Sequence, residues 1–184
     1  MKTPGCDLSR RNFLQTLSVA TTGLALYSPW RDVFAAAQDR SLSFFHTHTG
    51  EQIKLTYFSD GLYHEDALVE LNRYLRDFRT NEIHPIDANL FDILYAVKNA
   101  CNSNGTFEVI SGYRSPQTNQ YLHEKGRGVA TRSLHMDGKA IDVRLTDVQT
   151  SYLKKAAASL KRGGVGFYAK SDFVHIDTGR VRYW

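Results

Sequence analysis

The chain has 184 residues, of which 42% are hydrophobic and 23% charged, and its formal net charge is +4. This length allows one domain with a single core, and the mixed composition is typical of a globular fold. Residues 1–37 contain four basic and two acidic side chains, so half of the net charge belongs to this segment. The remainder is close to neutral, which excludes the strong electrostatic footprint of a nucleic-acid-binding protein.

The N-terminal segment predicts an export signal rather than a part of the fold. Arg10 and Arg11 lie in the sequence SRRNFL, an apolar stretch follows over 17–26, and alanines at 35–37 offer a cleavage site. This order is typical of a twin-arginine signal peptide. A membrane anchor is the alternative, but the apolar stretch is too short and too polar to span a bilayer. We therefore expect 1–37 to be removed after passage through the twin-arginine translocase.

The expected product is one domain over residues 38–184, located in the periplasm and not integral to the membrane. Its first part predicts a hairpin, because residues 42–46 and 52–57 alternate in polarity around a turn at Gly50. Apolar side chains at helical spacing then predict a helix over 65–78.

Capping residues mark the starts of two further helices. Asp87 is a suitable N-cap for a helix whose apolar face includes Leu90 and Leu94. A short strand over 107–110 precedes Ser115 and Pro116, which suit the cap and the first position of the next helix.

The second half of the domain is richer in strands. Strands are predicted over 140–145, 165–168 and 173–177, with a helix over 151–160. Because helices come early and strands late, we expect an α+β fold with a small antiparallel sheet packed with helices, not a doubly wound βαβ fold.

Two polar stretches, 133–142 and 172–177, interrupt these late strands with acids and imidazoles. An ionised group beside a core needs a partner or a metal, because burying it alone is very costly. Two histidines and an aspartate, here His135, His175 and Asp142, suit a zinc ion with one open position. That pattern points to hydrolysis.

Strand alternation supports a shared site but leaves an alternative open. Ile141 and Val143 point to one face of their strand and Asp142 to the other, while His175 alternates with apolar neighbours in the last strand. If the two strands are neighbours, Asp142 and His175 converge. Alternatively, the histidines are ordinary surface or core residues and Asp142 only pairs with Arg144.

The combined motifs resemble a known family. SxHxxGxAxD over 133–142, followed by DxxH over 172–175, looks like the M15 family of zinc D-alanyl-D-alanine peptidases, and SGYRS over 111–115 matches that family's arginine segment. The YcbK-like subgroup of murein endopeptidase K-like proteins is the closer likeness. It is carried by THTGE over 47–51, RGVA over 127–130, GGVGFY over 163–168 and FVHIDTG over 173–179. The likeness covers nearly all of residues 38–184 and implies a hedgehog/DD-peptidase-like fold.

The resemblance implies a metal centre and a proton acceptor. His135, Asp142 and His175 would hold one Zn²⁺, and Asp172 would be the general base. Several relatives have glutamate where this chain has Asp172, so Asp177 is the competing candidate for the base, or else a partner that orients His175.

The resemblance also implies substrate contacts and an activity. Arg114 would bind the scissile carbonyl oxygen or the oxyanion, and Ser133 would either fix its loop or bind the substrate backbone. Tyr113 lies near the predicted site in the sequence and would line the peptide-binding groove, with a core position as its alternative. The implied function is zinc-dependent murein endopeptidase activity on peptide cross-links of peptidoglycan, including the 3-3 link between two diaminopimelate residues, in cell-wall remodelling. The alternatives are a D-Ala-D-Ala carboxypeptidase or dipeptidase, and a non-catalytic peptidoglycan-binding module.

Overall fold

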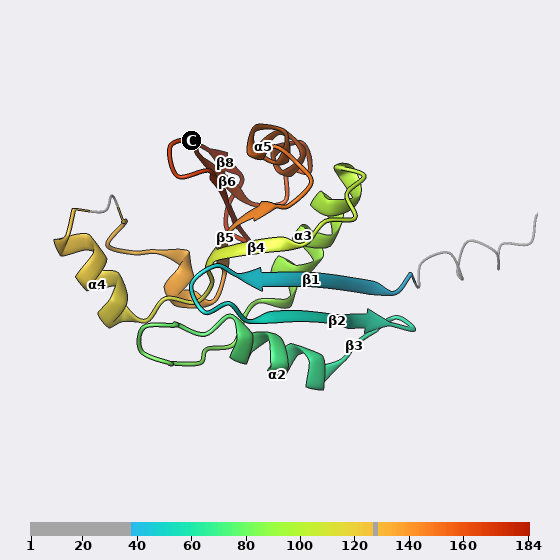
Figure 1. Cartoon of the computed structure of the whole chain (residues 1–184), viewed down its shortest axis with the longest axis horizontal. Helices are drawn as coiled ribbons and strands as arrows, with labels where there is room; N and C mark the ends of the chain where they lie inside the picture. Colours follow the sequence, from blue (N-terminus) through green and yellow to red (C-terminus); the bar gives the residue numbers. More distant parts are fainter. Residues whose placement is uncertain (1–37, 127–128) are drawn as a thin grey trace, which may run out of the picture. The chain divides into compact units, whose positions relative to one another are not determined.

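The computed structural model describes residues 38–126 and 129–184, and the expected signal segment 1–37 lies outside them. Within this part of the chain the strands form one eight-stranded sheet, in the order β3-β2-β1-β4-β5-β7-β6-β8 (Figure 1). The strands are β1 (Arg40–His46), β2 (Gln52–Ser59), β3 (Leu62–Tyr63), β4 (Phe107–Ser111), β5 (Ala140–Leu145), β6 (Gly164–Tyr168), β7 (Phe173–Asp177) and β8 (Arg182–Tyr183). The helices are α2 (Glu65–Tyr74), α3 (Ala88–Ala100), α4 (Pro116–Glu124), α5 (Thr150–Ser159) and the short 3-10 helix η1 (Leu134–Asp137). None of the helices in the described ranges combines the length and hydrophobicity needed to cross a bilayer.

The sheet is larger than expected and is mixed rather than antiparallel. β1 runs parallel to β4, and β6 runs parallel to β8. The β1–β4 pair is parallel because the chain between them contains β2, β3 and two helices, which return it to the starting end of the sheet. The expectation of a small antiparallel sheet was therefore wrong. Local alternation predicts strands, but it does not predict which distant strands pair.

The predicted hairpin and helix caps are confirmed. β1 and β2 pair antiparallel, as expected from the alternation around their turn. Asp87 accepts a hydrogen bond from the backbone N–H of Asn89 at the start of α3. Ser115 accepts one from the backbone N–H of Thr118 at the start of α4, where Pro116 is the first residue.

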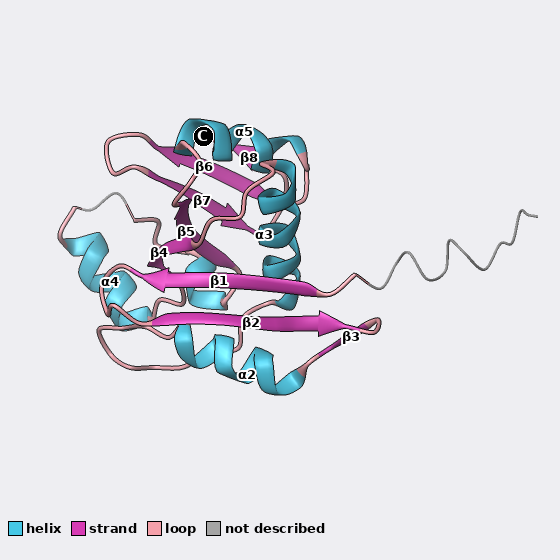
Figure 2. Cartoon of the chain, turned by 45° about the vertical axis from the view of Figure 1, so that its right-hand side comes forward, coloured by secondary structure: helices cyan, strands magenta, loops and turns pink. Residues whose placement is uncertain are grey.

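One face of the sheet forms the hydrophobic core beneath α2, α3 and α5 (Figure 2). Ile141 and Val143 of β5 point to this face and are fully buried, as are Val174 and Ile176 of the neighbouring β7. Side chains alternate between faces along a strand, so Asp142 points to the opposite face. The predicted alternation of β5 is thus confirmed, and it separates the core from the polar cluster described next.

Candidate metal centre

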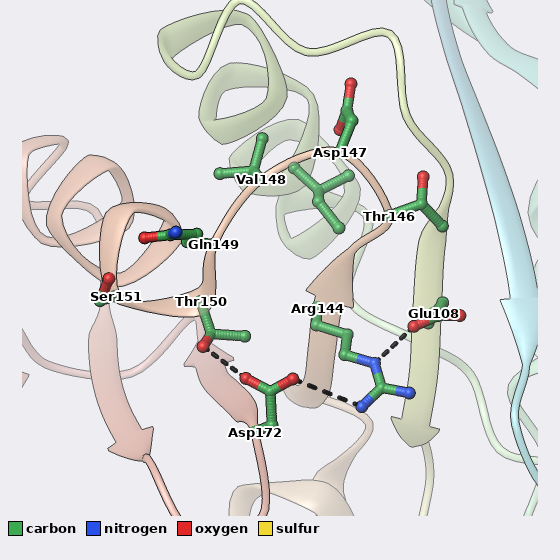
Figure 3. Close-up of a pocket in the computed structure, with 10 residues that line it drawn as sticks. Glu108, Arg144, Thr146, Asp147, Val148, Gln149, Thr150, Ser151 and Asp172 are labelled. Atoms are coloured by element: carbon green, nitrogen blue, oxygen red, sulfur yellow. Dashed lines mark hydrogen bonds and ion pairs between the residues drawn. The ribbon is translucent and has the colours of Figure 1, made fainter.

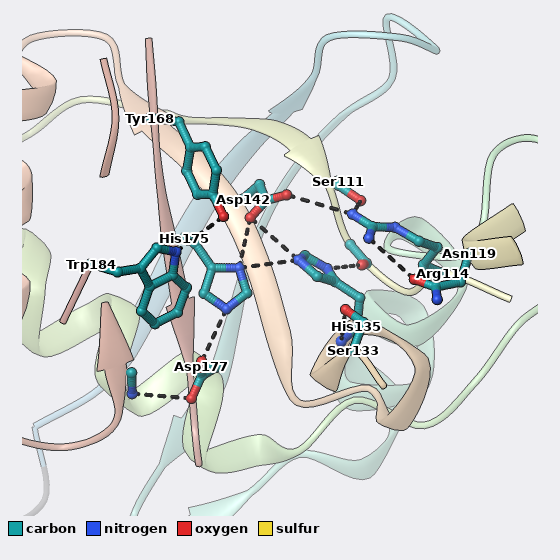
Figure 4. A network of polar contacts seen from close by, with 12 residues as sticks. Ser111, Arg114, Asn119, Ser133, His135, Asp142, Tyr168, His175, Asp177 and Trp184 are labelled. Carbon is teal, nitrogen blue, oxygen red and sulfur yellow. Dashed lines mark hydrogen bonds and ion pairs between the residues drawn. The ribbon is translucent and has the colours of Figure 1, made fainter. Parts of the chain in front are cut away.

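His135, Asp142 and His175 converge on the face of the sheet opposite the core (Figure 4). Asp142 and His175 are directly paired across β5 and β7, and His135 comes from η1. Oδ1 of Asp142 lies 2.9 Å from Nδ1 of His175 and 3.3 Å from Nε2 of His135. The two imidazole nitrogens lie 3.2 Å apart. Three donor atoms from three segments of the chain therefore meet in one small space.

The outer nitrogen of each imidazole is held by an oxygen acceptor. Nδ1 of His135 lies 2.8 Å from the carbonyl oxygen of Gly112, and Nε2 of His175 lies 3.0 Å from Oδ2 of Asp177. A ring N–H donated outward leaves the other nitrogen with a free lone pair. In the neutral form of both rings, which is the form that binds a metal, the two lone pairs point toward Asp142, and this is the arrangement that metal-binding histidines usually have.

The donor set fits a single zinc ion. Zinc lies ~2.0–2.1 Å from its nitrogen and oxygen ligands in a tetrahedral arrangement, so ligands that share one ion lie ~3.3 Å apart. The three donor separations here are 2.9, 3.2 and 3.3 Å. Because these separations are already close to those of a shared ion, binding needs little rearrangement of the three side chains, all of which are buried. These residues could hold one metal ion with a fourth position open to the cleft.

The buried carboxylates of the cluster favour a positive charge in the space between the three donors. Burial alone would lower the pKa of His175, but its hydrogen bonds with Asp142 and Asp177 outweigh this effect and raise the pKa to about 9. Burial alone would raise the pKa of Asp142, yet the charges and hydrogen bonds of the two imidazoles bring it below its usual value. The carboxylates thus stay ionised and attract protons or a metal cation to the space between them.

Arg114 lines a cleft of about 570 Å³ beside the three donors. Its guanidinium is only 3.8 Å from Asp142, and Asn119 and Ser111 accept its hydrogen bonds at 3.5 and 3.4 Å. Its Nε is buried without a hydrogen-bond partner among the described residues. Burial lowers the pKa of Arg114, although Asp142 opposes the shift. The long hydrogen bonds of Nη1 and Nη2 leave these two donors weakly satisfied beside the cleft.

The other two residues expected to contact substrate lie in different places. Ser133 lines the cleft, and its hydroxyl accepts a hydrogen bond from the backbone N–H of His135, so it also starts η1. Tyr113 is buried away from the cleft lining. Its hydroxyl donates to Glu82 at 2.7 Å and its ring stacks on His84.

Asp172 does not join the three donors in this structure. Its carboxylate lies in a separate cavity of about 700 Å³, where it accepts a hydrogen bond from Thr150 at 2.6 Å and lies 3.6 Å from Nη1 of Arg144 (Figure 3). Arg144 also pairs with Glu108. Asp172 precedes His175 by three positions along nearly extended chain, which corresponds to ~10 Å between their Cα atoms. The sequence also allowed Asp142 to pair only with Arg144. Among the described ion pairs, Arg144 contacts Glu108 and Asp172 and not Asp142.

Sequence reasoning overlooked two cleft residues near the end of the chain. Arg182 and Trp184 come from β8 and from the residue that follows it, and no strand was predicted there. A usable signal was present in the alternating Gly164 and Gly166 of β6, because glycine in a strand often marks a close approach of other groups.

Known proteins with similar sequences indicate the family of this chain. The sequence profile of a family of M15 peptidases, described as Peptidoglycan L,D-endopeptidase MepK, matches residues 34–184. A protein of that name from Escherichia coli strain K12 is 40% identical over 178 residues, which cover 97% of this chain and 98% of the relative. A probable peptidoglycan L,D-endopeptidase MepK from Haemophilus influenzae is 37% identical over 179 residues, which cover 97% of this chain and 96% of the relative.

A solved structure also aligns with the chain. The crystal structure of the Serratia marcescens L-Ala D-Glu endopeptidase ChiX has a TM-score of 0.40 and 19% sequence identity, and covers 61% of this chain and 86% of its own. The profile covers residues 34–184 and the two relatives cover nearly the full length of the chain, and both confirm the resemblance of its motifs to this family. The chain therefore belongs to the MepK-type M15 peptidases, a family of hydrolases.

Proposed function

We propose that this protein is a zinc-dependent murein endopeptidase that hydrolyses peptide cross-links in peptidoglycan, including the 3-3 link between diaminopimelate residues. The observation that carries the proposal is the convergence of His135, Asp142 and His175 within a cleft that Arg114 also lines. The relatives named as peptidoglycan L,D-endopeptidases support an endopeptidase over a carboxypeptidase. We further propose that residues 1–37 are a twin-arginine signal, which would deliver the domain over 38–184 to the periplasm.

The three donors would hold the zinc ion, which would supply a Lewis acid and a water of lowered pKa. Asp177 suits an orienting role better than that of a proton acceptor. It is fully buried, and its oxygens already accept from His175, Arg182 and the backbone N–H groups of Gly164 and Gly179. It therefore keeps the His175 lone pair aimed at the centre of the site.

Arg114 would stabilise the negative charge that develops on the scissile carbonyl oxygen. A preorganised donor beside a reacting carbonyl is most effective where water is excluded, and Arg114 is 8% exposed. Asn119 supports it from α4, since its carbonyl oxygen accepts from Arg114 while its amide donates to the backbone of Ala130 and Thr131. Ser133 would contribute a hydroxyl at the cleft wall.

Asp172 would accept the proton of the attacking water and transfer it to the leaving amine. This role requires its carboxylate to leave Thr150 and Arg144 and turn toward the cleft. The loop position supports such a turn, because the side chain is 61% exposed and lies just before β7.

Digestion of defined muropeptides tests the proposal. Purified protein should convert dimeric muropeptides with an L,D cross-link into monomers, a chelator should stop the conversion, and added Zn²⁺ should restore it. The matched control is His135→Ala, which removes one donor from η1 and should be inactive with or without zinc.

Product masses separate the alternatives. If the dimeric muropeptides stay intact and the monomeric muropeptides in the same digest lose one terminal residue, the protein is a carboxypeptidase. If the zinc-loaded protein binds sacculi but the masses of the muropeptides do not change, the protein is a binding module and the proposal is overturned.

A further inference from the structure

The end of the sheet brings Arg182 of β8 and Trp184, which follows this strand, to the candidate metal centre. The strand order β7-β6-β8 places β6 between β7 and β8, with Gly166 paired to His175 on one side and Gly164 paired to Arg182 on the other. Arg182 and Trp184 nevertheless contact residues of β7. They reach across the whole width of β6.

The glycines of β6 make this crossing possible. A Cβ at Gly164 would lie 2.4 Å from Nη1 of Arg182 and 2.5 Å from Oδ2 of Asp177, and one at Gly166 would lie 2.5 Å from the Trp184 ring. Real Cβ atoms do not approach other atoms so closely. Neither glycine has a positive φ, so the positions require space and not an unusual backbone conformation. The two glycines form a floor without side chains on which Arg182 and Trp184 lie.

Arg182 holds the carboxylate that orients His175. Its Nη1 and Nη2 donate to the two oxygens of Asp177 at 3.1 and 2.7 Å, which is the bidentate geometry that an arginine and a carboxylate form best. Oδ2 of Asp177 in turn lies 3.0 Å from Nε2 of His175. A chain of contacts therefore runs from β8 to the imidazole.

Trp184 confines the same imidazole from the side. Its indole lies 5.3 Å from the His175 ring, its Nε1 donates to the hydroxyl of Tyr168 at 3.1 Å, and the Arg182 guanidinium lies 4.9 Å from its centroid. The indole is thus held by two partners of its own. It lies in the lining of the cleft together with His175 and Tyr168 (Figure 4).

We propose that Arg182 and Trp184 are positioning residues that fix the His175 imidazole so that Nδ1 faces Asp142 and His135. The inference rests on the proposed function, since this orientation matters most when the site holds a metal. Partners behind metal-binding histidines typically change metal affinity by ~10–100-fold when they are removed.

Metal binding and thermal unfolding of four variants test the inference. Arg182→Gln and Trp184→Ala should each weaken Zn²⁺ binding by ~10-fold or more in competition with a chelator, and should alter the ligand-field absorption of bound Co²⁺. Arg182→Lys should be intermediate, because an ammonium keeps the charge but not the bidentate geometry. Gly166→Ala should resemble Trp184→Ala, because the new methyl group displaces the indole.

Tyr183→Phe is the matched control, because Tyr183 belongs to the same strand but points toward α5, where its hydroxyl donates to Ala158. It should keep the wild-type metal affinity and Co²⁺ spectrum even if its melting temperature falls.

The outcomes separate the two proposals. Wild-type zinc affinity and Co²⁺ spectra in folded Arg182→Gln and Trp184→Ala would overturn the inference, as would a lower melting temperature with an unchanged spectrum. Should Arg182→Gln not fold, the same reading applies to Arg182→Lys and Gly166→Ala. A wild-type protein that binds one metal ion but cleaves no muropeptide would refute the proposed function. The metal affinities and Co²⁺ spectra of the variants would still decide the inference.

Discussion

At the scale of single residues, the candidate site depends on where each imidazole directs its free nitrogen. His135 presents Nε2 and His175 presents Nδ1, because a backbone carbonyl holds one ring and Asp177 holds the other. The motif in the sequence contains both histidines, but it does not reveal which nitrogen faces the centre. That choice follows from the acceptors, which come from Gly112 and Asp177.

Asp172 yields a prediction at the same scale. Asp172→Asn keeps the shape of the side chain but cannot accept a proton, so turnover of cross-linked muropeptides should fall by ~10²–10⁴-fold, the usual contribution of a general base. Zinc affinity should remain that of the wild type, because Asp172 does not contact the three donors. The rate and the metal content are measured on the same sample.

Two further variants serve as controls for Asp172. Thr150→Val removes the hydroxyl that holds the carboxylate in the other cavity, and it should leave turnover equal to or above that of the wild type. Asp177→Asn should instead weaken zinc binding. Full turnover in Asp172→Asn would exclude Asp172 as the proton acceptor.

At the scale of elements, the turn between η1 and β5 places His135. Gly138 ends η1 in the left-handed region with φ 63°, and a Cβ there would lie 2.1 Å from the backbone oxygen of Pro85. The backbone N–H of Asp87 also donates to the carbonyl of Gly138. The turn is therefore packed directly against the segment that leads into α3.

Gly138→Ala compared with Gly50→Ala tests the importance of this packing. Both glycines have positive φ, but a Cβ at Gly50 would meet no atom within 4 Å. Gly50→Ala should lower the free energy of unfolding by ~1–2 kcal/mol, the usual effect of a left-handed non-glycine residue. Gly138→Ala should lower it by more and also weaken zinc binding, because η1 must shift. Urea unfolding of the two variants measures the difference, and equal losses would contradict the packing argument.

The element scale also shows where prediction from sequence succeeded. Asp87 and Ser115 identified the starts of α3 and α4 because capping depends on residues two or three positions away. The strand over 140–145 was predicted with its observed bounds because its core face alternates regularly. β8 was missed because two residues contain no alternation to detect.

At the scale of the whole molecule, stability should depend on pH through a residue remote from the cleft. His46 is 1% exposed in the core, and its Nε2 has no hydrogen-bond partner among the described residues. Burial and then the charge of His48 lower its pKa to about 4, with Glu51 opposing and Arg76 assisting. The folded protein therefore resists protonation at this position.

The sign of the effect follows from the two protonation states. The unfolded chain takes up a proton on His46 near its ordinary pKa of 6.5, but the folded chain does so only near 4, so stability falls as the pH decreases from 6.5 toward 4. The slope from this residue is at most ~1.4 kcal/mol per pH unit. His46→Leu should remove this dependence on pH, and its free energy of unfolding near neutral pH should equal or exceed that of the wild type. Urea unfolding across this range would contradict the assignment if both proteins declined in parallel.

The sequence by itself determined the helix caps and most of the strands, and it predicted the three candidate donor residues, because motifs, caps and alternation depend on neighbours along the chain. Only the tertiary structure decided that the sheet is mixed, that Asp172 contacts Thr150, and that Tyr113 turns toward Glu82. It also decided that Arg182 of β8 and Trp184, which follows it, cross the glycines of β6 to reach Asp177 and His175. Strand pairing and side-chain contacts between distant segments set these features, and their free energy comes from contacts that no local stretch of sequence contains.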